Sequence, residues 1–109
     1  MTKIYRGDRT LDGIAVTVDG APLDPAYRIL RLSTLGFEWG YEGAASAQLA
    51  LAIIADHSGD DTLALARHDA FMRLVVANFG NEWEISGADV DQILAQADRV
   101  SAPSKEAVL

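Results

Sequence analysis

The stretch AASAQLALAIIADH, residues 44–57, contains the longest apolar run of the chain and decides how the rest must be arranged. Leu49 and Ile53 share one face of a helix drawn through it, because they lie four residues apart. Leu51 and Ile54 extend the apolar surface well beyond that face. A helix with this pattern is buried on more than one side. The stretch therefore predicts a helix that other elements cover.

The residues before this helix show the marks of strands. Lys3–Arg6 alternates, and Ile14–Val18 is rich in β-branched residues. The second segment ends at Asp19-Gly20, a dipeptide that suits the positive φ of a hairpin turn. A further alternating segment, Tyr27–Leu32, follows the loop Ala21–Ala26, which two prolines interrupt. These residues predict an antiparallel meander of three strands.

The segment GFEWGYEG, residues 36–43, lies immediately before the helix and contains three glycines and three aromatic residues, of which the aromatic residues occupy every second position. The glycines allow tight backbone turns, and the alternating rings favour an irregular strand that leads into the helix. A domain of this size needs its aromatic residues inside. We therefore expect the three rings in the core, namely Phe37, Trp39 and Tyr41. The alternative is that Trp39 and Tyr41 are exposed and anchor a protein partner.

Two more helices are predicted after the first. Ser58–Asp61 ends the first helix, with Gly59 suited to its C-terminus and Asp60 or Asp61 to the N-cap of a helix over Thr62–Phe79. Ser86, with Asp89 three residues later, resembles a capping box that opens a third helix.

The third helix is expected to run through about Arg99. Before it, Glu82–Ile85 alternates over four residues and is either a short edge strand or an extended segment that packs Trp83. Together the elements predict an α+β fold, in which a small antiparallel sheet of about three to four strands packs against about three helices. Residues 1–99 form the single domain, and residues 100–109 are expected to be a flexible tail.

Composition limits the classes of function. The chain has 109 residues and no cysteine, which excludes disulfides, thiolate metal sites and a cysteine nucleophile. Sixteen acidic residues against nine basic ones give a net charge of −7, which opposes direct binding to nucleic acid or to an anionic membrane. The absence of a long apolar run and of a signal segment predicts a soluble, cytoplasmic protein.

No residue set in the chain defines a reaction, so we expect no catalytic residue, no cofactor and no metal. The alternative is a small enzyme or a metal- or ligand-binding domain. It would use Asp56, His57, Asp60 and Asp61, which lie close in sequence and pair carboxylates with an imidazole. The same residue types suit a helix end, a turn and an N-cap.

The acidic residues are unevenly distributed along the chain. Residues 38–109 carry twelve of the acids and four of the bases, a balance of −8. Regularly spaced carboxylates on a rigid surface can imitate the phosphates of a nucleic acid and attract a basic partner. We therefore predict a partner-binding surface that includes Glu38, Glu42, Glu82, Glu84, Asp91 and Asp98.

The residues GFEWGYEG (36–43), followed by AQLALAIIAD (47–56), resemble a small domain family of unassigned function found in bacteria and on their mobile elements. The resemblance extends to Tyr5-Arg6-Gly7 and to Trp83–Ser86, and covers most of residues 4–95. The chain departs from the family at Ala44-Ala45-Ser46, where members tend to have Ser-Gly-Pro. This change weakens the expected N-cap of the first helix.

The resemblance implies no catalytic residue, but it adds a biological context. Small acidic proteins carried by phages and plasmids often act by occupying a host protein. Charge and context together predict a non-enzymatic inhibitor that occupies the basic nucleic-acid-binding surface of a host defence complex, in the manner of a DNA mimic and of an anti-CRISPR protein. The oligomeric state does not follow from the sequence.

Overall fold

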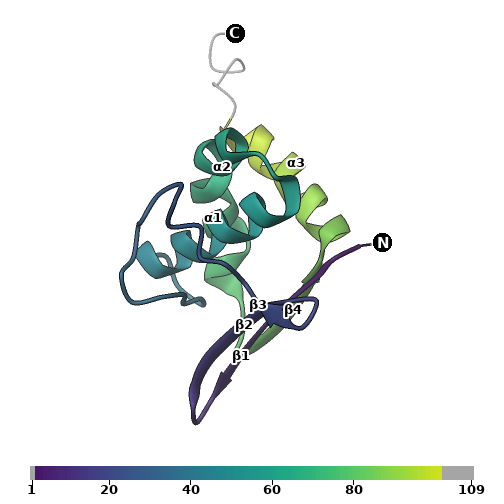
Figure 1. Ribbon diagram of the computed structural model, residues 1–109. Coiled ribbons are helices and arrows are strands. Elements are labelled where there is room, and N and C mark those ends of the chain that lie inside the picture. The colour runs from purple at the N-terminus through teal and green to yellow at the C-terminus, as the bar shows by residue number, and fades with distance from the viewer. Residues whose placement is uncertain (1, 102–109) are drawn as a thin grey trace, which may run out of the picture.

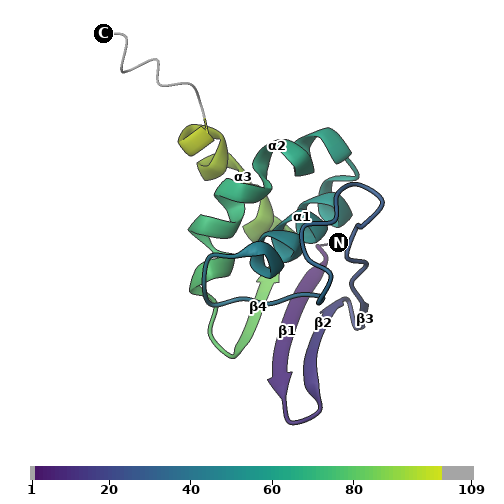
Figure 2. The ribbon, with the colours of Figure 1, turned by 90° about the vertical axis from the view of Figure 1, so that its left-hand side faces the viewer.

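The computed structural model describes residues 2–101, which form a four-stranded antiparallel sheet with three α-helices on one side (Figures 1 and 2). This confirms the predicted α+β class. No helix in this part of the chain is long and apolar enough to cross a membrane. The strands are β1 (Ile4–Thr10), β2 (Gly13–Val18), β3 (Ala21–Pro22) and β4 (Glu82–Ser86). The helices are α1 (Ala44–Ser58), α2 (Asp61–Leu74), the short 3₁₀ helix η1 (Val76–Asn78) and α3 (Gly87–Ser101).

The strand order is β3-β2-β1-β4, so the first strand of the chain lies inside the sheet and the last lies at its edge. Asp19 and Gly20 form the turn between β2 and β3, with φ angles of 50° and 87°. This confirms the predicted hairpin turn. However, the strand after the turn is Ala21–Pro22, inside the segment expected to be a loop.

Tyr27–Leu32, expected as the third strand, forms turns instead. Ala26 adopts a positive φ of 61°, and its carbonyl accepts a hydrogen bond from the Ile29 amide at 3.0 Å. The Gln48 side chain on α1 accepts hydrogen bonds from the amides of Leu32 and Ser33. The backbone of this segment is therefore paired with a helix side chain and with itself, and no strand forms.

α1 is buried along most of its length, as its sequence predicts. All residues from Ser46 to Ala55 are buried, and the helix packs against α2. Gly59 ends the helix with a φ of 68°, which confirms its predicted role. At the other end Gly43 provides no side-chain cap, as expected from the Ala44-Ala45-Ser46 opening.

The two later helices differ from their predicted bounds at the C-terminal ends. α2 ends at Leu74, and the residues up to Asn78 form η1 rather than a continuous helix. α3 begins at the predicted capping box, in which the Ser86 amide donates to Asp89 at 2.9 Å and the Asp89 amide donates to Ser86 at 3.1 Å. It continues to Ser101, two residues into the predicted tail; residues 102–109 lie outside the described part.

The aromatic residues are divided between core and surface. Trp39 is 1% exposed, and its indole N–H donates to the Gly80 carbonyl at 2.7 Å. Trp83 of β4 meets Trp39 edge to face and stacks on Phe79 at a centroid distance of 4.3 Å. Tyr41, expected in the core, is 51% exposed, because residues 36–39 are irregular and residues 40–43 form bends, and not a strand that would turn its ring inward.

Candidate functional site

The pairing of β1 with β4 places two of the predicted acids on the outer face of the sheet. Glu84 lies directly opposite Arg6, and Glu82 lies directly opposite Asp8. Side chains alternate along a strand, so Tyr5, the residue before Arg6, points to the helices and is fully buried. The outer face, which the helices do not cover, therefore carries charged side chains.

Two shallow depressions of about 440 and 430 Å³ lie on this face and share Arg6 and Glu84. One contains Asp8 and Glu82, and the other contains Asp19 at the end of β2. We call this surface the outer sheet face. Its charged residues are one base and four acids, a net charge of −3: Arg6, Asp8, Asp19, Glu82 and Glu84.

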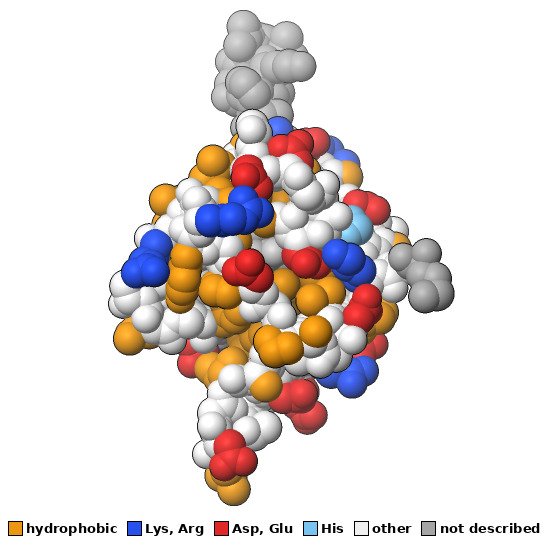
Figure 3. Space-filling view, in the orientation of Figure 1, with side chains coloured by type: hydrophobic (Ala, Val, Ile, Leu, Met, Phe, Trp, Pro, Cys, Tyr) orange, Lys and Arg blue, Asp and Glu red, His pale blue; other side chains and the backbone are white. Residues whose placement is uncertain are grey.

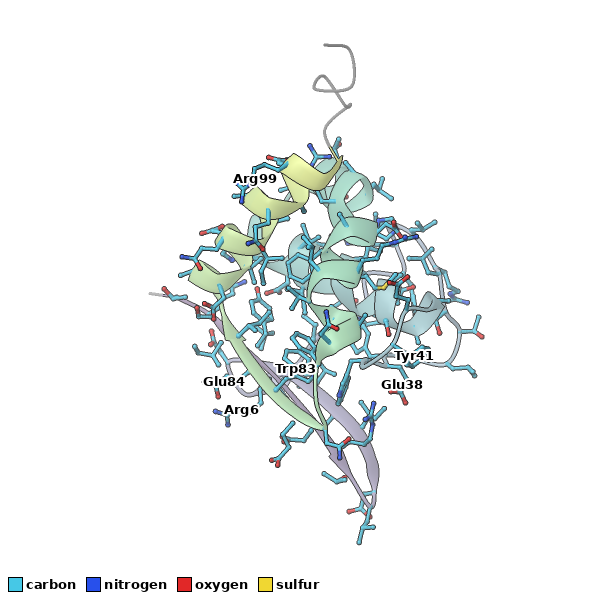
Figure 4. All side chains as sticks on the ribbon, turned by 180° about the vertical axis from the view of Figure 1, so that it is seen from behind. Arg6, Glu38, Tyr41, Trp83, Glu84 and Arg99 are labelled. Atoms are coloured by element: carbon cyan, nitrogen blue, oxygen red, sulfur yellow. The ribbon has the colours of Figure 1, made fainter. Side chains whose placement is uncertain are left out.

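Arg6 and Glu84 form an ion pair, in which the guanidinium Nε donates to Glu84 Oε1 at 3.0 Å (Figure 4). The hydrogen bond and the charge of Glu84 raise the pKa of Arg6 above its usual value. The two side chains are 58% and 52% exposed, so solvent screens the pair and it adds little to stability.

Glu38 lies away from Arg6 and Glu84, with Trp83 between them in the view of Figure 4. It forms an ion pair with Arg9, whose guanidinium also donates to Asn81 and sits 4.8 Å from the centroid of the Trp39 ring. These contacts tie the segment before α1 to β1. Glu38 therefore has a structural role.

Glu42 is exposed and has no ion-pair partner within residues 2–101, but it lines neither depression. The two predicted acids of α3 are engaged with helix neighbours: Asp91 accepts from His57 Nε2 at 2.7 Å, and Asp98 pairs with Arg67. The six predicted residues therefore do not form one patch. Figure 3 shows acidic, basic and hydrophobic side chains intermixed over the face in view.

The alternative set is not brought together either. Asp56 accepts hydrogen bonds from Tyr5 at 2.7 Å and from Lys3 at 3.1 Å. Asp60 caps α2 by accepting from the Leu63 amide, and Asp61 pairs with Arg28. His57 contacts Asp91, as above. No group of three or more His, Asp or Glu side chains in the described chain is placed to hold a metal ion.

Asp8 and Asp19 were not predicted, although they share the outer sheet face with Glu82 and Glu84. Both come from the first third of the chain, where acids and bases nearly balance. For Asp8 the available signal was strand alternation, which places Arg6 and Asp8 on one face. The strand expected from the sequence ended at Arg6, whereas β1 continues to Thr10. The position of Glu82 opposite Asp8 depends on the pairing of two strands that are distant in sequence, so no pattern of neighbouring residues predicts it.

The sequence profile of a family of unknown function (DUF6166) matches residues 5–96. The chain therefore belongs to this family, which agrees with the resemblance inferred from its motifs. The matched residues include β2, β3 and β4, all of β1 except Ile4, and most of α3. No curated protein and no solved structure matches the chain.

Proposed function

We propose that this protein is a non-enzymatic interaction protein that binds a basic protein surface through its outer sheet face. The face is rigid, because it is built on paired strands whose opposite side holds the core residues Tyr5 and Trp83. Its net charge of −3 favours a cationic partner and accelerates encounter with it.

One observation carries the proposal: Asp8 and Glu82 face each other across the strand pair. Like charges directly opposite in an antiparallel pair destabilise a sheet. Neither has an ion-pair partner within residues 2–101. The repulsion within this pair disfavours the sheet, whereas a cationic partner that contacts both carboxylates converts the repulsion into attraction.

We further propose that the basic surface is the nucleic-acid-binding surface of a host defence complex of the CRISPR kind, and that the protein is a phage- or plasmid-borne inhibitor of it. Side chains two apart on one face of a strand repeat about every 7 Å. Successive phosphates of one DNA strand are separated by an axial rise of about 3.4 Å and by the rotation of the helix, which together place them roughly 7 Å apart. Glu82 and Glu84 can therefore meet, at matching intervals, cationic residues that contact successive phosphates.

Competition with DNA tests the proposal. A purified DNA-binding effector complex is loaded with labelled duplex and titrated with the full chain at low and at high salt. We expect displacement at low salt that weakens as ionic strength rises, since exposed charges are screened. The Asp8→Asn/Glu82→Gln variant should displace less DNA, whereas Glu42→Gln should match the unmodified chain. DNA that stays bound at low salt with the chain in excess would contradict the proposal.

A further inference from the structure

The free edge of β4 carries backbone groups that the sheet does not pair. Just beyond β4 the Gly87 amide donates to the Lys3 carbonyl at 2.8 Å. In an antiparallel pair every second residue bonds to the partner strand, so Ile85 and Trp83 also face β1. The amides and carbonyls of Glu84 and Glu82 therefore point away from the sheet.

Nothing within residues 2–101 pairs with this edge, because β4 is the terminal strand in the order β3-β2-β1-β4. At the opposite edge β3 pairs with Thr17 and Val18 of β2, and the Leu23 amide donates to the Val16 carbonyl. β3 has only two residues, and one of them is Pro22, which has no amide hydrogen to donate. β4 has five residues and no proline. It is therefore the edge at which the sheet can be extended.

Charge determines what can pair there. A residue directly opposite Glu84 on an added strand lies on the same outer face, at cross-strand contact distance. If a second copy of this chain paired its β4 here, Glu84 would face an acid or an uncharged residue, because β4 contains no base. A strand with Lys or Arg at alternate positions instead places a base against each acid.

We infer that the β4 edge binds an extended basic segment of a partner protein, which adds a fifth strand to the sheet. Two basic residues of that segment lie opposite Glu82 and Glu84, and the residues between them turn toward the side of Trp83 and Ile85. The backbone hydrogen bonds give the contact its direction and the carboxylates select the sequence. The inference rests on the proposed function and specifies how the outer sheet face engages its partner.

A peptide whose backbone is blocked at chosen positions tests this without altering the protein. The probe is a nine-residue peptide that alternates lysine with valine or threonine, titrated calorimetrically into the full chain at low salt. In one version the two central lysines carry N-methyl groups, which remove the amides that face β4. In the matched control the methyl groups are on the residues between, whose amides face solvent.

We expect the lysine-methylated peptide to bind about tenfold or more weakly, because two hydrogen bonds are lost, and the control peptide to bind like the unmodified one. Hydrogen exchange should show the amides of Glu82 and Glu84 becoming protected on binding, while those of Trp83 and Ile85 do not change. Glu82→Gln should weaken binding about two- to fivefold, as for an exposed ion pair. Glu42→Gln should not.

Equal binding of the two methylated peptides would overturn the inference, since recognition would then depend on charge alone. That result would leave the proposed function intact, because displacement of DNA is measured independently and needs no strand pairing. Failure of the unmodified peptide to bind would also overturn the inference. So would protection of the Glu82 and Glu84 amides at rising protein concentration without peptide, which would identify a second copy as the occupant.

Discussion

Gln48 is a fully buried polar side chain that holds the loop before α1 in place. Its Oε1 accepts from the Leu32 and Ser33 amides, and its Nε2 donates to the Pro25 and Leu30 carbonyls at 2.7 and 3.1 Å. Gln48→Leu retains the size but leaves these groups without partners. We expect the free energy of unfolding to fall by about 3 kcal/mol or more, measured by urea denaturation.

The exposed Gln92 on α3 provides the control for this substitution. Gln92→Leu should change the unfolding free energy by no more than about 0.5 kcal/mol. If both variants unfold at the same urea concentration, the interpretation of Gln48 as the anchor of this loop is wrong.

Gly7 is required by the ring that covers it. A Cβ at this position would lie 2.2 Å from Nε1 of Trp83, which is held by Phe79 and Trp39 and has little room to move. Gly7→Ala should therefore destabilise the fold by about 2 kcal/mol in thermal or urea unfolding. Gly80→Ala, where a Cβ meets nothing within 4 Å, should have a small effect. A tolerated Gly7→Ala would show that Trp83 can leave its position.

Tyr5 makes stability depend on alkaline pH. Burial, and then its hydrogen bond to Asp56, raise the pKa of the Tyr5 hydroxyl above its usual range. Above about pH 10 the unfolded chain loses this proton, whereas the folded chain keeps it. The contribution of Tyr5 to the free energy of unfolding is therefore complete below that pH and decreases above it. Relative to Tyr5→Phe, the unmodified chain should lose up to about 1.4 kcal/mol per pH unit above about pH 10. If urea denaturation gives the two proteins the same dependence of unfolding free energy on pH, this prediction is wrong.

At the scale of elements, features set by neighbouring residues could be predicted. The Asp19-Gly20 turn, the end of α1 at Gly59 and the Ser86–Asp89 capping box depend on local backbone geometry and short hydrogen bonds. Tyr27–Leu32 could not, because its alternation is that of a strand while its backbone is paired by a helix side chain distant in sequence. Tertiary contacts therefore override a local strand preference.

Asp60, at the start of α2, has a structural role that can be distinguished by experiment from the metal-binding alternative. Its carboxylate accepts the Leu63 amide at 3.0 Å, as an N-cap does. Asp60→Ala should lower the unfolding free energy by about 1 kcal/mol. The loss should be the same with and without millimolar Ca²⁺ or Mg²⁺ in the buffer. Stabilisation of the unmodified chain by either cation, absent in the variant, would instead favour the alternative.

At the scale of the whole molecule, the sequence predicted that six acids share one surface, and the structure places only some of them together. Glu82 and Glu84 lie on the outer sheet face, whereas Asp91 and Asp98 pair with helix neighbours. Which carboxylates share a face depends on the register of β4 against β1, which joins the two ends of the domain. Charge counts along the chain carry no information about that register.

On the outer sheet face, a substitution that stabilises the fold should weaken binding to the partner. Glu82→Gln removes the repulsion across from Asp8 and should raise the unfolding free energy by about 0.5 kcal/mol. The same change should weaken the displacement of DNA described above. Glu42→Gln should alter neither property. A Glu82→Gln protein that is less stable than the unmodified chain would show that Glu82 serves the fold.

The sheet order also bears on how the protein is made. β1 leaves the ribosome well before β4, yet it pairs with β4 on one side and with β2 on the other. Contacts between such distant segments form late and slowly. The nascent chain can close the hairpin at once, but it must wait for Ser86 to emerge before Trp83 can cover Gly7. Until then one edge of β1 is unpaired, and an unpaired strand edge is prone to incorrect pairing and aggregation.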